Sequence, residues 1–160
     1  MRKIIPAVFL VIALMIASCT SLDCPLNNTT YTKYKLMGNV TTLNDTLSIS
    51  TTKQEGTDSV LINKDVKVDS FILPMGYHQP EDVFYFEIRN KYHQVWKDTV
   101  TVKKENYSHF ESVDCGASYF HTIMEVKTTH NYIDSIVINH KEVNYDASKA
   151  HFYIYFGNRD

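Results

Sequence analysis

The sequence predicts an all-β protein whose strands form two antiparallel sheets packed face to face. Three observations support this prediction. After Leu26 no stretch has a convincing helical period. Short runs rich in β-branched and aromatic residues instead alternate between apolar and polar positions, which is typical of strands with one buried face. Turn residues separate these runs at fairly regular spacing, which predicts about eight or nine strands.

Five runs show the alternation most clearly. Their apolar side chains are, in chain order, Leu47 and Ile49; Phe84, Phe86 and Ile88; Trp96, Val100 and Val102; Phe120, Met124 and Val126; and Phe152, Ile154 and Phe156. Polar or tyrosine residues lie between them, including His121, Glu125, Tyr153 and Tyr155. Two packed sheets let the apolar faces meet in one core, as in immunoglobulin-like Greek-key sandwiches. A closed β-barrel is the alternative, since alternation alone separates the two poorly.

The first twenty residues resemble an export signal. Arg2 and Lys3 precede an apolar run over residues 4–17, which is too short to span a bilayer and matches the apolar segment of a secretory signal. The run ends in IASC, which resembles the lipobox of bacterial lipoproteins. In that class the cysteine is diacylated on sulfur, the chain is cut before it and the new N-terminus is acylated. We therefore predict a lipoprotein signal peptide over residues 1–18 and lipidation of Cys19, with an ordinary signal peptide as the alternative.

Lipid on Cys19 would anchor the protein to a membrane, because each buried methylene contributes about 0.8 kcal/mol and several chains together hold stably. Thr20 follows Cys19, and by resemblance to lipoprotein sorting rules this favours the outer membrane. The acidic cluster of surface-exported Bacteroidales lipoproteins is missing, which favours a periplasm-facing anchor over surface exposure. Residues 19–30 are then the lipidated N-terminus and tether, and residues 31–160 are the β-sandwich domain.

Cys24 and Cys115 are the cysteines that remain beside Cys19. An even pair in an oxidising compartment is most simply a disulfide. Loop-closure entropy predicts roughly 4–5 kcal/mol of stabilisation for a loop of this length. A metal site or a reactive thiol is the alternative, but no Cys-x-x-Cys motif accompanies either cysteine.

Several segments resemble a family of small Bacteroidales lipoproteins known only as a domain of unknown function. They are SLDCPLNNTTYTKYKL, FILPMGY, PEDVFYFEI, HFESVDCG, IDSIVINHKEVNYD and HFYIYF. The resemblance covers most of the mature chain and includes Cys24 and Cys115. The family has no known active site, so the resemblance assigns a catalytic role to no residue of this sequence. Related genes often lie near genes for predicted outer-membrane proteins, which implies an outer-membrane protein as partner.

No motif in the sequence predicts catalysis. There is no Gly-x-Ser-x-Gly elbow, no phosphate-binding glycine loop and no His-Glu-x-x-His motif. Scattered histidines are expected at the surface: His78, His93, His121, His130, His140 and His151. The net charge of −2 comes with no basic patch. We therefore predict a protein that is not an enzyme, with no metal, no cofactor and no nucleic-acid partner.

Aromatic residues near two turns are the candidate ligand contacts. Tyr77 and His78 lie in one loop, and Tyr92 and His93 lie at another turn. Flat rings near loop tips stack on sugars or anchor a protein partner. Trp96 follows the second turn, but its parity with the valines that follow it favours a place in the core.

One tripeptide pattern recurs four times: Asp45-Thr46-Leu47, Asp58-Ser59-Val60, Asp98-Thr99-Val100 and Asp134-Ser135-Ile136. It resembles the sequon for O-glycosylation of exported Bacteroidales proteins. The structural alternative is that Asp ends a turn and the next two residues open a strand. We rank Thr46 and Thr99 above Ser59 and Ser135 as glycosylation sites, because the two serines precede continuous apolar runs that are expected to be covered on both faces.

Together these features predict a non-enzymatic lipoprotein anchored in the outer membrane that binds or supports another component of the cell envelope. The alternative is a carbohydrate- or ligand-binding module that uses the loop aromatics.

Overall fold

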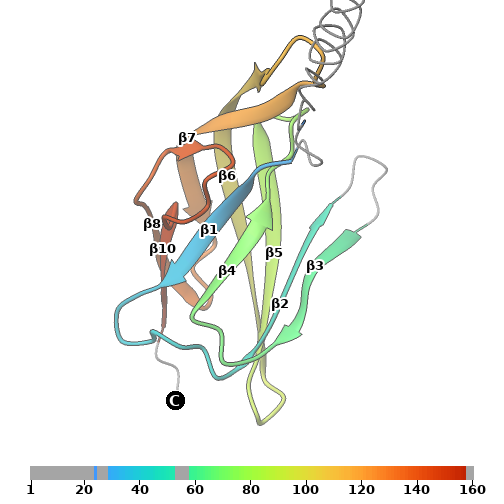
Figure 1. The fold of residues 1–160 in the computed structure, drawn as a ribbon. Helices are drawn as coiled ribbons and strands as arrows, with labels where there is room; N and C mark the ends of the chain where they lie inside the picture. Colours follow the sequence, from blue (N-terminus) through green and yellow to red (C-terminus); the bar gives the residue numbers. More distant parts are fainter. Residues whose placement is uncertain (1–23, 25–28, 53–57, 158–160) are drawn as a thin grey trace, which may run out of the picture.

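The computed structural model describes residue 24, residues 29–52 and residues 58–157. Its strands form two sheets packed face to face (Figure 1), with the orders β4-β1-β10-β8 and β3-β2-β5-β6-β7-β9. The strands are β1 (Tyr31–Leu36), β2 (Thr46–Thr52), β3 (Asp58–Asp65), β4 (Ser70–Pro74), β5 (Glu81–Arg89), β6 (Val95–His109), β7 (Ser118–Thr128), β8 (Ile133–Ile138), β9 (Glu142–Val143) and β10 (Phe152–Phe156). These strands do not close into a barrel, so the predicted β-sandwich is confirmed.

The described residues form ten strands, against the eight or nine expected. One of the ten is the two-residue strand β9, which pairs with β7. All pairs are antiparallel except β1 and β10, which run parallel with Tyr34 opposite Phe152. The prediction of antiparallel sheets is therefore wrong at that pair. A tight hairpin forces antiparallel pairing only between strands that follow each other, and these two strands come from opposite ends of the domain.

The apolar face of four of the five predicted runs lies in the core. The buried side chains from these runs are Leu47, Ile49, Phe84, Phe86, Ile88, Val100, Val102, Phe152, Ile154 and Phe156. Tyr34 of β1 stacks between Phe71 and Phe152, with ring centroids 5.0 and 4.7 Å away. Trp96 is half-buried, packs against the core and lies 5.0 Å from the ring of Tyr132, so the core interpretation of Trp96 holds in part.

The fifth run, in β7, is where the predicted parity fails. Val126 pairs with Val102 and faces the core, but His121 and Ile123 are buried while Met124 is exposed. Lys103 of β6 pairs with Glu125 and Lys104 pairs with Ile123, so Met124 of β7 is an extra residue that bulges out. After the bulge even-numbered residues of β7 face the core, whereas before it odd-numbered residues do. The expectation that Phe120 and Met124 face the core is therefore wrong.

β6 is the longest strand, with 15 residues, and it connects the two ends of the molecule. Its last residues and the start of β7 form a hairpin that projects beyond the other strands (Figure 1, top). We call the turn of this hairpin, residues 110–117, the hairpin tip. The β4–β5 loop, residues 75–80, packs beside β6 toward the same end, where Lys104 N donates to Pro80 O at 2.8 Å. The β5–β6 turn, residues 90–94, lies at the opposite end.

Candidate functional site

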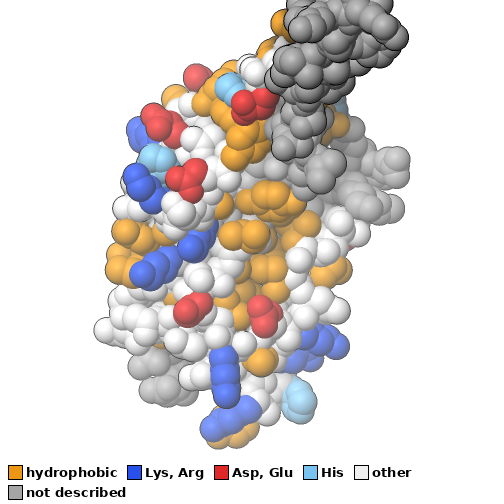
Figure 2. All heavy atoms as spheres, viewed as in Figure 1, with side chains coloured by type: hydrophobic (Ala, Val, Ile, Leu, Met, Phe, Trp, Pro, Cys, Tyr) orange, Lys and Arg blue, Asp and Glu red, His pale blue; other side chains and the backbone are white. Residues whose placement is uncertain are grey.

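A cleft of about 670 Å³ opens between the β4–β5 loop and the neighbouring ends of β2 and β5. Its lining residues are Thr29, Thr51, Thr52, Pro74, Met75, Gly76, Tyr77, His78, Gln79, Asp82, Val83, Phe84 and Tyr85. Figure 2 shows hydrophobic side chains gathered in the middle of the face that β1 and β4 present. The cleft therefore combines apolar walls with hydroxyl groups and one carboxylate.

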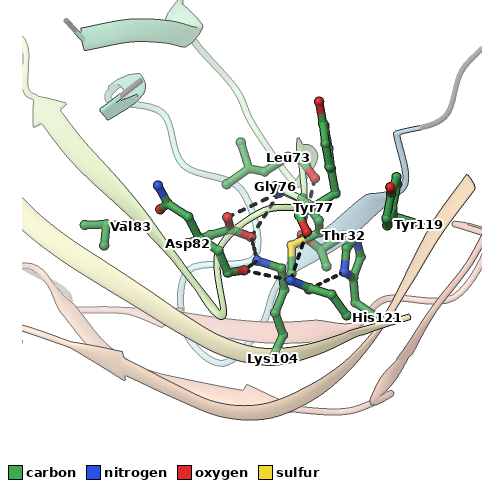
Figure 3. Close-up of polar contacts among 12 residues, drawn as sticks. Thr32, Leu73, Gly76, Tyr77, Asp82, Val83, Lys104, Tyr119 and His121 are labelled. Atoms are coloured by element: carbon green, nitrogen blue, oxygen red, sulfur yellow. Dashed lines mark hydrogen bonds and ion pairs between the residues drawn. The ribbon is translucent and has the colours of Figure 1, made fainter. Parts of the chain in front are cut away.

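A buried ion pair holds the loop that forms one wall of the cleft (Figure 3). Lys104 Nζ of β6 lies 2.7 Å from Asp82 Oδ2 of β5 and donates to Gln79 O at 3.0 Å. The Asp82 carboxylate also accepts from Gly76 N at 3.2 Å. Glycine suits this position, because an added Cβ would lie 2.7 Å from Asp82 Oδ1 and would push the carboxylate aside. Asn106 Nδ2 completes the attachment by donating to Tyr77 O and Gln79 O.

The two charges of this ion pair are removed from solvent. The Lys104 side chain is 0% exposed and the Asp82 side chain is 12% exposed. Burial raises the pKa of Asp82, and the Lys104 ammonium and the Gly76 N–H lower it in part. Such a pair is costly to break, since either charge alone would be left buried without a partner. The β4–β5 loop is therefore fixed to β6 as a rigid wall.

His121 lies behind this ion pair and is fully buried. Its Nδ1 is 2.7 Å from Asn106 Oδ1, an acceptor, which assigns the proton to Nδ1. Its Nε2 has no hydrogen-bond partner among the described residues. Burial, and to a smaller extent the positive charge of Lys104, lower the pKa of His121 to about 4. His121 and His151 are both buried, so the expectation of surface histidines is wrong for these two.

The four predicted ligand contacts do not form one site. Tyr77 and His78 line the cleft, and the Tyr77 ring stacks on Tyr119 with centroids 4.8 Å apart. Tyr92 and His93 lie beyond the other end of β5, about 26 Å along a strand of nine residues. Tyr92 is exposed there and borders a separate depression of about 720 Å³. Of the four predicted contacts, only Tyr77 and His78 therefore line the cleft.

The alternative interpretation of the Asp-Ser/Thr tripeptides is that each one marks the start of a strand, and it holds at two of the four. β2 opens at Thr46 and β3 opens at Asp58, but Asp98 and Asp134 lie inside strands. Asp98 is buried and accepts four hydrogen bonds, all of 2.7–2.8 Å, from Thr129 Oγ1 and from the backbone N–H groups of Asn131, Tyr132 and Ile133. Burial raises its pKa, but these bonds outweigh burial and the pKa lies below the ordinary value. Asp98 therefore fixes the β7–β8 turn.

Thr46, Thr99, Ser59 and Ser135 are all partly exposed. Thr46 and Thr99 each precede a fully buried residue, Leu47 and Val100, as the ranking of the sites expects. The reason given for ranking the serines lower is wrong, because β3 is an edge strand and Val60 is 62% exposed. Glycosylation itself stays a prediction.

The predicted site residues leave out several residues of the cleft region: Asp82, Tyr85, Lys104, Asn106 and His121. One signal for Lys104 exists in the sequence, since it shares its parity with Val100 and Val102 and so continues their inward face. A charged residue at such a position needs a partner of opposite charge. His121 carries no such signal, because the bulge in β7 reverses its parity.

The described part of the chain contains no group of three or more His, Cys, Asp or Glu side chains arranged to hold a metal ion. It also contains no helix of the length and apolar character needed to cross a membrane. The predicted lipidation site, Cys19, and the signal peptide over residues 1–18 lie outside the described residues.

Cys24 and Cys115 form a disulfide, with their Cα atoms 5.5 Å apart. The bond joins residues 91 positions apart and attaches the start of the domain to the hairpin tip. The predicted pairing is therefore confirmed.

The model of a family of unknown function, DUF6452, matches residues 46–156. No curated protein and no solved structure matches the chain. The match covers the chain from β2 to β10, including every cleft residue except Thr29, and most of its length, so the protein belongs to this family of unknown function.

Proposed function

We propose that the protein is a non-enzymatic lipoprotein, anchored in the outer membrane through Cys19 and facing the periplasm, whose cleft binds another component of the cell envelope. The anchor rests on the resemblance of residues 16–19 to a lipobox. The observation that supports binding is the cleft itself. Its loop wall is fixed by the Asp82–Lys104 ion pair, and a preorganised wall lowers the entropy cost of binding.

The arrangement of charge beneath the cleft supports a non-enzymatic role. Asp82 and Lys104 pair with each other rather than with the open cleft. His121 is fully buried, and burial keeps it neutral at physiological pH. A general acid or base needs a proton that it can exchange with a substrate, within hydrogen-bond reach. These three side chains act instead as supports for the loop.

Affinity capture from native membranes tests this function. Full-length lipidated protein is captured as wild type, as Tyr77→Ala and as Tyr92→Ala, and the co-purifying envelope components are identified. Tyr77 lines the cleft, whereas Tyr92 is an exposed tyrosine at the other end of β5, so it is the matched control. We expect a component that is lost with Tyr77→Ala and kept with Tyr92→Ala. Identical sets of components in all three samples would refute binding through the cleft.

A carbohydrate ligand is the second candidate, and the composition of the cleft favours it. Tyr77 and Tyr85 are exposed rings, and Thr51 and Thr52 at the end of β2 add hydroxyl groups to the lining, where Thr52 Oγ1 donates to the Tyr85 hydroxyl at 3.3 Å. Rings that stack and hydroxyls that hydrogen-bond are what a sugar requires. Calorimetric titration of the full-length protein in detergent with envelope glycans checks this. Saturable heat that disappears in Tyr77→Ala supports it, and no heat with any glycan refutes it.

A further inference from the structure

The hairpin tip exposes large apolar side chains to solvent. Val113 is 97% exposed and Phe110 is 60% exposed. Tyr107, just before the tip on β6, is also exposed. Exposure of such side chains to water is unfavourable. Covering them is favourable by about 25 cal/mol for each Å² of apolar surface removed from water. This end of the sandwich therefore presents an apolar surface that nothing in the described structure covers.

Aromatic rings surround the tip. His109, Phe120 and Tyr145 contact one another, with centroids between 4.4 and 6.3 Å apart, and Tyr107 lies 6.1 Å from Phe120. Tyr77 and Tyr119 form a second stacked pair near the start of β7. Tyrosine rings with an apolar body and a polar hydroxyl are enriched at the boundary between membrane and water. The hairpin end thus has the composition of an interfacial surface.

The disulfide places this surface beside the predicted anchor. Cys115 lies in the hairpin tip and is bonded to Cys24. Cys19 precedes Cys24 by five residues, which span at most about 18 Å when fully extended. The Cys24 and Cys115 Cα atoms are 5.5 Å apart, so the tip lies within about 24 Å of the predicted lipidation site. The β5–β6 turn lies at the far end of β6, about 45 Å away along the strand.

We propose that the hairpin tip docks on the membrane that holds the acyl chains, with Phe110 and Val113 inserted at the headgroup level and the surrounding tyrosines at the interface. This rests on the proposed lipid anchor and adds the orientation of the domain. Residues 105–120 contain no Lys or Arg, and Glu111 and Asp114 are exposed, so the contact is apolar and suits zwitterionic headgroups. The cleft, whose wall includes Tyr77, then opens near the membrane, and Tyr92 points away from it.

Tryptophan quenching by lipid measures this orientation. Full-length lipidated protein is reconstituted in phosphatidylcholine vesicles with brominated acyl chains, as wild type, Phe110→Trp and Tyr92→Trp. Both substitutions replace an exposed aromatic ring at a hairpin turn, one at each end of β6. The native Trp96 lies near the Tyr92 end and supplies the background signal, which is subtracted. We expect the emission added by Phe110→Trp to fall, since bromine on the acyl chains quenches only rings that lie at membrane depth. The emission added by Tyr92→Trp should stay unquenched.

Flotation of the same vesicles separates the two proposals. If the protein floats with the vesicles and Phe110→Trp is quenched no more than Tyr92→Trp, the docking proposal is wrong while the anchor stands. If the protein does not float, the anchor is wrong, and the docking proposal falls with it. Stronger quenching of Tyr92→Trp would reverse the orientation and overturn the proposal.

Discussion

Asp98 shows how much of this fold depends on one side chain. Oδ1 accepts from Thr129 Oγ1 and Asn131 N, and Oδ2 accepts from Tyr132 N and Ile133 N. A carboxylate is the one side chain of this size whose two oxygens both act only as acceptors. The residue thereby connects β6 to the β7–β8 turn, where the chain passes from the six-stranded sheet to the four-stranded sheet.

The substitution Asp98→Asn should destabilise the protein by about 1–3 kcal/mol, because in either orientation the amide NH₂ would face at least one backbone N–H donor and leave it without its acceptor. Denaturant unfolding measures the change. Asp134→Asn is the control, since Asp134 belongs to the same kind of tripeptide but is exposed, and it should change stability by less than about 0.5 kcal/mol. Equal effects of the two substitutions would contradict this role.

His121 should make the stability depend on pH. Its folded pKa of about 4 lies below the ordinary value of 6.5, so the unfolded chain binds a proton first as the pH falls. The contribution is fully present above pH 6.5 and is lost between pH 6.5 and 4, by up to about 3 kcal/mol. The free energy of unfolding of wild type and His121→Asn, measured across this range, isolates the effect. Parallel curves for the two proteins would contradict it.

At the scale of elements, β6 organises the molecule. It pairs with β5 along one edge and β7 along the other, and its Lys104 fixes the β4–β5 loop. Lys104→Met should cost about 3–5 kcal/mol, because it leaves the Asp82 carboxylate buried without its partner. Lys103→Met, at the exposed neighbouring position, is the matched control and should be nearly neutral. Thermal unfolding compares the two, and equal unfolding temperatures would show that the ion pair does not stabilise the loop.

Local patterns predict the strands well where the pairing is regular. The two-residue alternation runs through all of β10, through β5 from Val83 onward and through β2 as far as Ser50, so the buried residues of these segments can be identified from the sequence. β7 cannot be predicted in this way, because the bulge at Met124 depends on its pairing with β6 and leaves no clear local signal. The parallel pair of β1 and β10 is likewise a consequence of the whole fold.

At the scale of the molecule, the disulfide ties the first described residue to the hairpin tip. Reduction, or Cys24→Ser, should lower stability by up to roughly 4–5 kcal/mol, since the bond closes a loop of most of the domain. The double substitution of Cys24 and Cys115 by Ser should match the single one, because both remove the same bond. Thermal unfolding with and without reductant checks this, and equal unfolding temperatures would contradict a stabilising bridge.

The candidate site was predictable only in part, because it is formed by residues that the whole fold brings together. Tyr77 and His78 can be identified in the sequence as aromatic residues of a loop, and they line the cleft. The sequence does not show how far Tyr92 and His93 lie from them, because only the length and direction of β5 place the two loops at opposite ends. The ion pair beneath the cleft joins residues from two strands, and sequence spacing does not show which charges meet.

The central claim is that a lipid on Cys19 holds a disulfide-bonded binding domain at the outer membrane. Intact-mass analysis of protein extracted from the outer membranes of its own host tests it directly, with peptide mapping of the N-terminus. The claim predicts a mature chain that starts at Cys19, carries fatty acyl groups on that residue and contains the Cys24–Cys115 bridge. A mature chain that starts elsewhere, or an unmodified Cys19, would contradict it.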